Sequence, residues 1–262
     1  MDRDLLIDII GNLQGIVEKY DRDRNFHFNK KEDGIIRGSK TIPVIQNKLR
    51  HRYVLVPEII YEASGIMIMG KRIKSLLFTT DLAIIRNNNA DAIFAVYPFT
   101  PEASIMQASI EAASVPVFSG IGGGTTYGYR SVILGFLAEL LGSYGVVVNA
   151  PMQNEDIRTI AKTIDIPIVA SIYSEDNDLL GKVNAGAEII NVSSGKNTNE
   201  IVKKVREKLG PNFPIIATGG HTEEDIQKTL EAGANAITYV PPTSGEIFHL
   251  VMEEYRNKKE GS

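Results

Sequence analysis

The sequence predicts an α/β fold, a (β/α)8 TIM barrel preceded by an N-terminal helical and β extension. From residue 74 onward, eight short apolar runs alternate with amphipathic helical patterns. Strands that are apolar throughout are typical of a parallel sheet buried on both faces. Eight such units close into a barrel more naturally than they stay open, and an open doubly wound sheet is the alternative.

The composition fits a single globular domain. Of the 262 residues, 43% are hydrophobic and 23% are charged, which is enough to bury a full core without crosslinks. The formal net charge of −4 provides no basic field, so we expect neither nucleic acid nor a membrane as partner. There is no cysteine, which excludes disulfides and thiolate chemistry. No signal-peptide pattern or transmembrane-length apolar run occurs, and we expect a cytoplasmic protein.

Residues 1–73 are predicted to form an extension packed on the barrel core of residues 74–262, all within one domain. Apolar side chains at helical spacing over residues 2–20 predict an amphipathic helix that either caps the barrel or forms a homodimer. The polar, turn-rich residues 21–37 predict a loop. Residues 41–61 hold short β-like runs interrupted by prolines, which form either an additional hairpin or the start of the first strand.

The barrel units follow in order along the chain. Strands are expected at residues 75–79, 92–97, 115–119, 145–149, 167–172, 188–192, 215–217 and 236–240. Helices are expected at residues 82–88, 102–113, 129–141, 155–164, 179–185, 199–209, 223–232 and 245–255. Chemistry in such barrels takes place at the carboxyl ends of the strands, so the residues that follow each strand are the candidates for a site.

The loops after the seventh and eighth strands predict an anion site. Gly219 and Gly220 follow the seventh strand, where their backbone N–H groups would face an anion with no side chain between. Two prolines follow the eighth strand and remove two donors. The remaining donors would come from Thr243, Ser244 and Gly245 at the start of the last helix. The alternative is a plain tight turn at the glycine pair.

The stretch IIATGGHTEEDIQKTLEAGANAITY resembles the seventh and eighth units of the phosphate-binding (β/α)8 barrels. This superfamily includes the ribulose-phosphate-binding barrels, thiamine-phosphate synthase and the sugar-phosphate epimerases. The matched positions are Gly219 and Gly220, then Ala232, Gly233 and Ala234. The resemblance implies the barrel fold and a phosphorylated ligand, but no reaction. The eighth loop departs from the family, which usually places another glycine directly after that strand.

The third loop is the second unusual feature. Three consecutive glycines, Gly122, Gly123 and Gly124, precede Thr125. This pattern predicts either a loop that closes over a substrate or a flexible surface connection. It is not a dinucleotide fingerprint, because the G-x-G-x-x-G spacing fails at Thr125. Tyr97, which follows the second strand, is expected to direct its hydroxyl into the same mouth.

Three residues are candidates for the catalytic groups. Asp81 follows the first strand and is either a general acid or base, or the N-cap of the next helix. His221 follows the glycine pair, where it would exchange protons near neutral pH or lie exposed. Asn149 ends the fourth strand and would orient the substrate, unless it is a satisfied buried amide. Gly195, after the sixth strand, is expected to line the mouth.

These residues predict an enzyme that acts on a small phosphorylated or anionic metabolite by metal-free acid/base chemistry. A lyase, isomerase or synthase is expected, and a hydrolase using the same site or a non-catalytic regulatory sensor are the alternatives. No histidine pair has metal-ligand spacing with a carboxylate, so no metal is expected. No cofactor is expected either; FMN is the less favoured alternative, because little of the chain remains for an isoalloxazine pocket.

Overall fold

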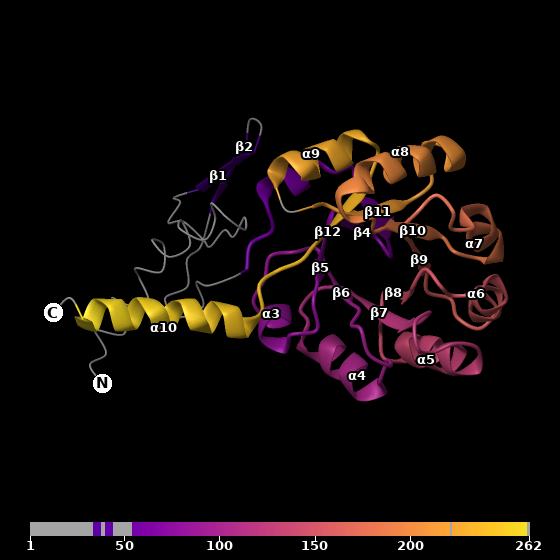
Figure 1. Ribbon diagram of the computed structural model, residues 1–262, viewed down its shortest axis with the longest axis horizontal. Helices are drawn as coiled ribbons and strands as arrows, with labels where there is room; N and C mark the ends of the chain where they lie inside the picture. Colours follow the sequence, from indigo (N-terminus) through magenta and orange to yellow (C-terminus); the bar gives the residue numbers. More distant parts are fainter. Residues whose placement is uncertain (1–33, 38–39, 44–53, 221, 261–262) are drawn as a thin grey trace.

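The computed structural model describes residues 34–37, 40–43, 54–220 and 222–260. Within these residues, eight parallel strands form a closed barrel (Figure 1). The last strand pairs in parallel with the first, through Thr238 and Leu76 among others. This confirms the predicted (β/α)8 barrel and excludes the open sheet. The strands are β5 (Ser75–Phe78), β6 (Ala92–Ala95), β7 (Val117–Gly122), β8 (Gly145–Val148), β9 (Ile168–Ile172), β10 (Ile189–Val192), β11 (Ile215–Thr218) and β12 (Ala236–Tyr239).

Helices between the strands cover the outside of the barrel (Figure 1). Each presents an apolar stripe at helical spacing, as in the helix that buries Ile157 and Ile160 completely. The last helix, α10 (Ser244–Glu260), extends away from the barrel (Figure 1). The others are α3 (Leu82–Arg86), α4 (Ala103–Ala112), α5 (Tyr129–Leu140), α6 (Asn154–Ala161), α7 (Leu179–Ala185), α8 (Thr198–Leu209) and α9 (Glu223–Glu231).

The barrel interior is filled by layers of four side chains from alternate strands, as the strand register requires. The lower layers are apolar, and the layers nearer the carboxyl ends contain polar side chains. From the amino end upward, three successive layers are Leu76, Phe118, Val169 and Ile216; then Phe94, Val147, Asn191 and Thr238; then Phe78, Gly120, Ser171 and Thr218. The polar end is therefore the open mouth.

A short hairpin closes the opposite, amino end of the barrel. It consists of β3 (Ile66–Ile68) and β4 (Lys71–Ile73), which pair antiparallel. The side chains of Ile66, Ile68 and Ile73 are buried in the same cluster as the barrel interior. The turn contains Gly70 at φ 76°, a conformation that glycine adopts without strain. Solvent and ligand can therefore reach the interior from the mouth end.

Two details of the extension differ from the sequence prediction. The segment predicted as a loop contains β1 (Gly34–Arg37), which pairs antiparallel with β2 (Lys40–Pro43). The short run Gly-Ile-Ile-Arg favours a strand because of its β-branched pair, although the surrounding residues are polar. Downstream, η1 (Glu58–Glu62) is a 3₁₀ helix instead of a strand, since Pro57 with φ −53° favours a helix start.

Two other predictions for the extension concern residues outside the described ranges. They are the amphipathic helix over residues 2–20 and a homodimer formed through it. Among the described helices, none has both the length and the apolar character needed to cross a membrane.

Candidate functional site

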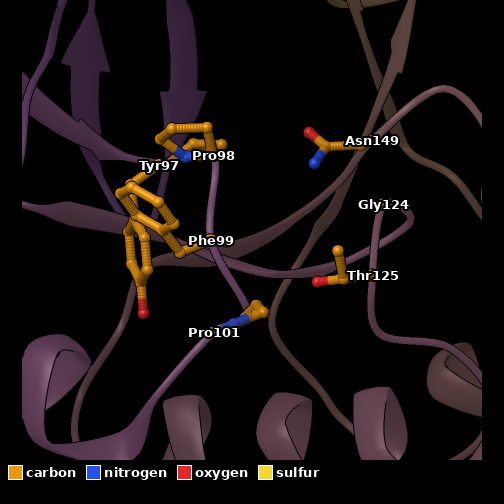
Figure 2. Close-up of a pocket in the computed structure, with 10 residues that line it drawn as sticks. Tyr97, Pro98, Phe99, Pro101, Gly124, Thr125 and Asn149 are labelled. Atoms are coloured by element: carbon orange, nitrogen blue, oxygen red, sulfur yellow. The ribbon is translucent and has the colours of Figure 1, made fainter.

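A cavity of about 190 Å³ opens at the carboxyl ends of β6, β7 and β8 (Figure 2). The segment after β6 forms an apolar wall through Pro98, Phe99 and Pro101. Thr125 and Asn149 lie on the other side, from the loops that follow β7 and β8. The cavity is smaller than a typical drug-sized pocket, so it fits a small metabolite. The complete lining is Val96, Tyr97, Pro98, Phe99, Pro101, Gly120, Gly122, Gly124, Thr125 and Asn149.

The glycine loop is fixed against the end of β8. The Asn149 N–H donates to the Gly122 carbonyl over 2.8 Å, and the Gly123 N–H donates to the Thr126 carbonyl over 2.9 Å. Gly122 and Gly123 have φ values of 145° and 96°, which disfavour any residue with a side chain. A Cβ on Gly123 would lie 2.7 Å from the Asn149 carbonyl oxygen. The loop is therefore built for close backbone contact, which argues against a loose surface connection.

Several hydrogen-bond donors at the cavity are not engaged by the chain. The Gly124 N–H, the Thr125 N–H and the Asn149 amide make no hydrogen bond to the part of the chain that the structure describes. The Thr125 and Thr100 hydroxyl oxygens lie 3.1 Å apart. In Figure 2, the Asn149 amide and the Thr125 hydroxyl both point toward the proline-rich wall. Such a concave set of donors is suited to an oxyanion.

Tyr97 contributes its ring, not its hydroxyl, to the cavity. The hydroxyl oxygen accepts a hydrogen bond from the Glu102 N–H over 2.7 Å, and it points away from Asn149 (Figure 2). Burial raises the pKa of Tyr97, and the nearby charge of Glu102 acts in the same direction. Tyr97 thus holds the loop between β6 and α4, and its hydroxyl, which was expected to point into the mouth, bonds to that loop.

Asp81 is the N-cap of α3. Its Oδ1 accepts from the Ala83 N–H over 3.0 Å and the Ile84 N–H over 3.4 Å. Its Oδ2 accepts from the Ser244 N–H over 2.8 Å and the Ser244 hydroxyl over 2.5 Å. Burial acts to raise the pKa of Asp81, but these hydrogen bonds outweigh it and lower the pKa. The carboxylate thus joins α3 to the start of α10, and the N-cap interpretation describes its geometry.

The donors predicted for a phosphate are partly engaged by the chain's own carboxylates. The Ser244 N–H donates to Asp81, and the Thr243 N–H donates to Glu246 Oε2 over 2.8 Å. The Gly219 N–H donates to the Thr238 carbonyl over 3.3 Å. An anion at this place would have to displace those contacts. The phosphate site at these loops therefore stays a prediction.

The other glycines predicted for the site follow β10, β11 and β12. The N–H groups of Gly220 and Gly245 make no hydrogen bond within the described ranges. Gly195 starts the short helix η2 (Gly195–Asn197), and its carbonyl accepts from the Thr198 hydroxyl over 2.8 Å. None of these three glycines lines the cavity. His221 lies outside the described residues.

The sequence prediction brought together one half of this cavity and missed the other. Tyr97, Gly122, Thr125 and Asn149 were predicted and do line it. The apolar wall of Pro98, Phe99 and Pro101 was not predicted, although two prolines around an exposed phenylalanine directly after a strand are a recognisable signal.

No family model matches the chain, and no curated protein does either. Solved structures share its fold. A phosphonopyruvate hydrolase has a TM-score of 0.57 at 14% identity, covering 75% of this chain and 85% of its own. A phosphoenolpyruvate phosphomutase from Streptomyces platensis subsp. rosaceus has a TM-score of 0.55 at 12% identity, covering 77% of this chain and 84% of its own. A 2,3-dimethylmalate lyase has a TM-score of 0.54 at 14% identity, covering 78% of this chain and 85% of its own. Identities this low show the (β/α)8 fold alone.

The comparison corrects the prediction that the chain needs no cofactor. Another structure of phosphonopyruvate hydrolase was solved in complex with oxalate and Mg²⁺. This enzyme, which shares the fold, has thus been solved with a divalent cation, so the expectation that the chain needs neither metal nor cofactor was wrong.

The described residues of this chain do not themselves fit a magnesium site. Within them, no group of three or more histidine or acidic side chains is placed to hold a metal ion. Magnesium is usually held by one or two carboxylates together with waters and substrate oxygens. Both oxygens of Asp81 already accept hydrogen bonds from Ser244, Ala83 and Ile84, and no described residue lining the cavity is acidic.

Proposed function

We propose that this chain is an enzyme that acts on a small anionic organic acid or its phosphorylated relative in the cavity beside the glycine loop. The observation that carries the proposal is the set of unengaged donors from Gly124, Thr125 and Asn149, which faces an apolar wall in a cavity of about 190 Å³. The named activities of the neighbours, on phosphonopyruvate, phosphoenolpyruvate and 2,3-dimethylmalate, support this ligand class.

A lyase or isomerase reaction suits this arrangement best. Such reactions place negative charge on an oxygen next to the carbon atom that reacts. Donors held in position lower the barrier most when they are aimed at the oxygen on which the charge develops. The Gly124 and Thr125 N–H groups and the Asn149 amide would bind that oxygen, and the wall formed by Phe99 and its neighbouring prolines would exclude water. For proton transfer, His221 stays the candidate predicted from the sequence.

A non-catalytic sensor is the second candidate function. The observation that favours it is that no described residue lining the cavity carries a charged side chain. A neutral cavity can bind an anion through hydrogen bonds while offering no acid or base from its own lining. The two functions differ in one measurable respect, because a sensor binds its ligand without converting it.

The test combines binding and turnover on one panel of acids. Malate, oxalate, phosphonopyruvate and phosphoenolpyruvate are titrated calorimetrically, each with and without Mg²⁺, and incubated with the protein under NMR detection. Asn149→Leu removes the amide at similar volume, and Asn199→Leu at the start of α8 is the control outside the cavity.

An enzyme should bind at least one acid and convert it. Asn149→Leu should weaken binding about tenfold or more, because one hydrogen bond to a charged group is lost. Binding without conversion of any acid would favour the sensor. Absence of binding in the wild type, or equal binding by Asn149→Leu and Asn199→Leu, would overturn the proposal.

A further inference from the structure

The middle layer of the barrel interior contains two buried oxygen atoms without a hydrogen-bond partner. They are Asn191 Oδ1 on β10 and Thr238 Oγ1 on β12, and neither bonds to any residue that the structure describes. The two side chains are only 5% and 4% exposed. Buried polar atoms are nearly always satisfied in native proteins, because leaving one unpaired costs the full desolvation penalty. Two such atoms in one layer therefore indicate a group that the chain itself does not supply.

The orientation of Asn191 is set by its neighbour. Its Nδ2 donates to the Ser171 hydroxyl oxygen over 3.1 Å, which leaves Oδ1 directed elsewhere. Asn191 Oδ1 therefore needs a donor, and the second N–H of Nδ2 stays available beside it. The Thr238 hydroxyl can both donate and accept. A hydroxyl group that donates to Asn191 Oδ1 and accepts from the Thr238 hydroxyl would satisfy both atoms.

The polar pair lies one layer below the mouth of the barrel, and one residue of the layer above it lines the cavity. That layer holds Phe78, Ser171 and Thr218, and its fourth position is Gly120, which has no side chain. Gly120 also lines the cavity. A ligand seated beside the glycine loop therefore lies next to this upper layer, whose four residues are only partly buried, with the polar pair directly below.

We propose that Asn191 and Thr238 form an inner subsite that binds a hydroxyl group of the substrate. This inference rests on the proposed function and deepens it. The hydroxyl would donate to Asn191 Oδ1 and accept from the Thr238 hydroxyl, which satisfies both atoms at once. A charged group does not suit the subsite, because no described residue of the interior layers could balance its charge.

The substrate is then an acid with a hydroxyl group, and its two ends are separated in the site. The anionic end lies at the donors of Gly124, Thr125 and Asn149, and the hydroxyl lies inside the barrel. The neutral character of the interior thus determines which end of the molecule enters first.

Calorimetric titration with matched pairs of probes tests the subsite. The pairs are malate with succinate, and 3-hydroxypropyl phosphate with propyl phosphate, which differ in each case by one hydroxyl group. The wild-type protein should bind the hydroxylated member of at least one pair about tenfold more tightly, the contribution of one net hydrogen bond. Thr238→Val, of nearly the same shape, and Asn191→Leu should each remove that preference while affinity for the unhydroxylated member is kept.

Thr126→Val is the matched control. Thr126 also has a buried hydroxyl without a partner among the described residues, but it belongs to the loop after β7 and not to the barrel interior. The Thr126→Val variant should prefer the hydroxylated member of each pair as strongly as the wild-type protein does. Equal affinity for both members of each pair, or a preference that survives in Thr238→Val, would overturn the subsite and leave an internal water as the simplest partner of the two atoms. Failure to bind any of the four probes while oxalate, phosphonopyruvate or phosphoenolpyruvate binds would overturn the subsite alone, and failure to bind any acid of either set would overturn the proposed function.

Discussion

Replacing Gly123 by alanine tests whether the glycine loop is a rigid part of the site. Gly123 has φ 96°, and an added Cβ would meet the Asn149 backbone at 2.7 Å from its oxygen and 2.8 Å from its nitrogen. Neither atom belongs to a flexible side chain, so the loop or the end of β8 has to move. The Asn149 N–H, which donates to the Gly122 carbonyl over 2.8 Å, would be disturbed with it.

The expected cost has two parts that a control can separate. Holding alanine at positive φ costs about 1–2 kcal/mol, and relieving the overlap adds about 1–3 kcal/mol, as for other overpacked sites. Gly142 has φ 90°, but nothing lies within 4 Å of its Cβ position. Gly142→Ala should therefore lower the free energy of unfolding by about 1–2 kcal/mol, and Gly123→Ala by about 2–5 kcal/mol.

Urea unfolding gives the two free energies, and titration with the acid panel gives the affinities. Gly123→Ala should weaken anion binding by about tenfold or more, since it moves the donors of Gly124, Thr125 and Asn149. Gly142→Ala should leave binding unchanged. Equal destabilisation by both variants, with wild-type affinity in Gly123→Ala, would refute a rigid loop that presents these donors.

Three further outcomes follow from the structure. Asp81→Ala should lower the free energy of unfolding by about 1–2 kcal/mol at pH 7, because an N-cap is lost. The pKa of Asp81 in the folded protein lies below its ordinary 3.8, so this difference should persist above that pH and vanish as the pH falls through the folded-state pKa. Urea unfolding at several pH values measures it, and equal stability of variant and wild type at pH 7 would show that the cap is unimportant. Thr126→Val should raise the free energy of unfolding by about 1 kcal/mol, since it removes a buried hydroxyl without a partner, and a loss of stability would indicate a contact that the described residues do not show. Burial lowers the pKa of Lys182, so the folded state releases this proton at a lower pH than the unfolded state does. The free energy of unfolding should therefore rise with pH from the folded-state pKa toward 10.5. Lys182→Met should flatten that rise, and the same dependence of stability on pH in the variant would contradict a lowered pKa of Lys182.

The fold could be predicted because its signals are local and repeated. Each strand is an apolar run and each helix has its own apolar stripe, so an error in one unit leaves the others intact. The extension was harder, since a two-isoleucine strand such as β1 (Gly34–Arg37) is too short to stand out against polar neighbours. The helix α10 (Ser244–Glu260) continues beyond its predicted end at residue 255 because lysine and glutamate favour a helix even where the apolar pattern stops.

The site was harder to predict because contacts between distant residues decide it. Ser244 and Asp81 are separated by 163 positions, and no local pattern shows that they bond to each other. The inner pair had a local signal that was not used. In the runs Ile-Ile-Asn-Val and Ala-Ile-Thr-Tyr, Asn191 and Thr238 are polar residues at inward-facing positions. A polar side chain at an inward position of a buried strand needs a hydrogen-bond partner inside the barrel, so such positions can be marked from the sequence as candidates for a buried polar contact.

A small anion should bind at the loop after β7, and amide chemical shifts can locate it residue by residue. Malate is titrated into the isotopically labelled, assigned protein, and backbone and side-chain amide signals are followed. We expect saturable shifts that are largest at the Gly124 and Thr125 N–H groups and the Asn149 side-chain amide. Shifts that are largest at Gly220 and Gly245 would place the anion at the loops after β11 and β12 and contradict binding at the loop after β7, and so would the absence of any saturable shift.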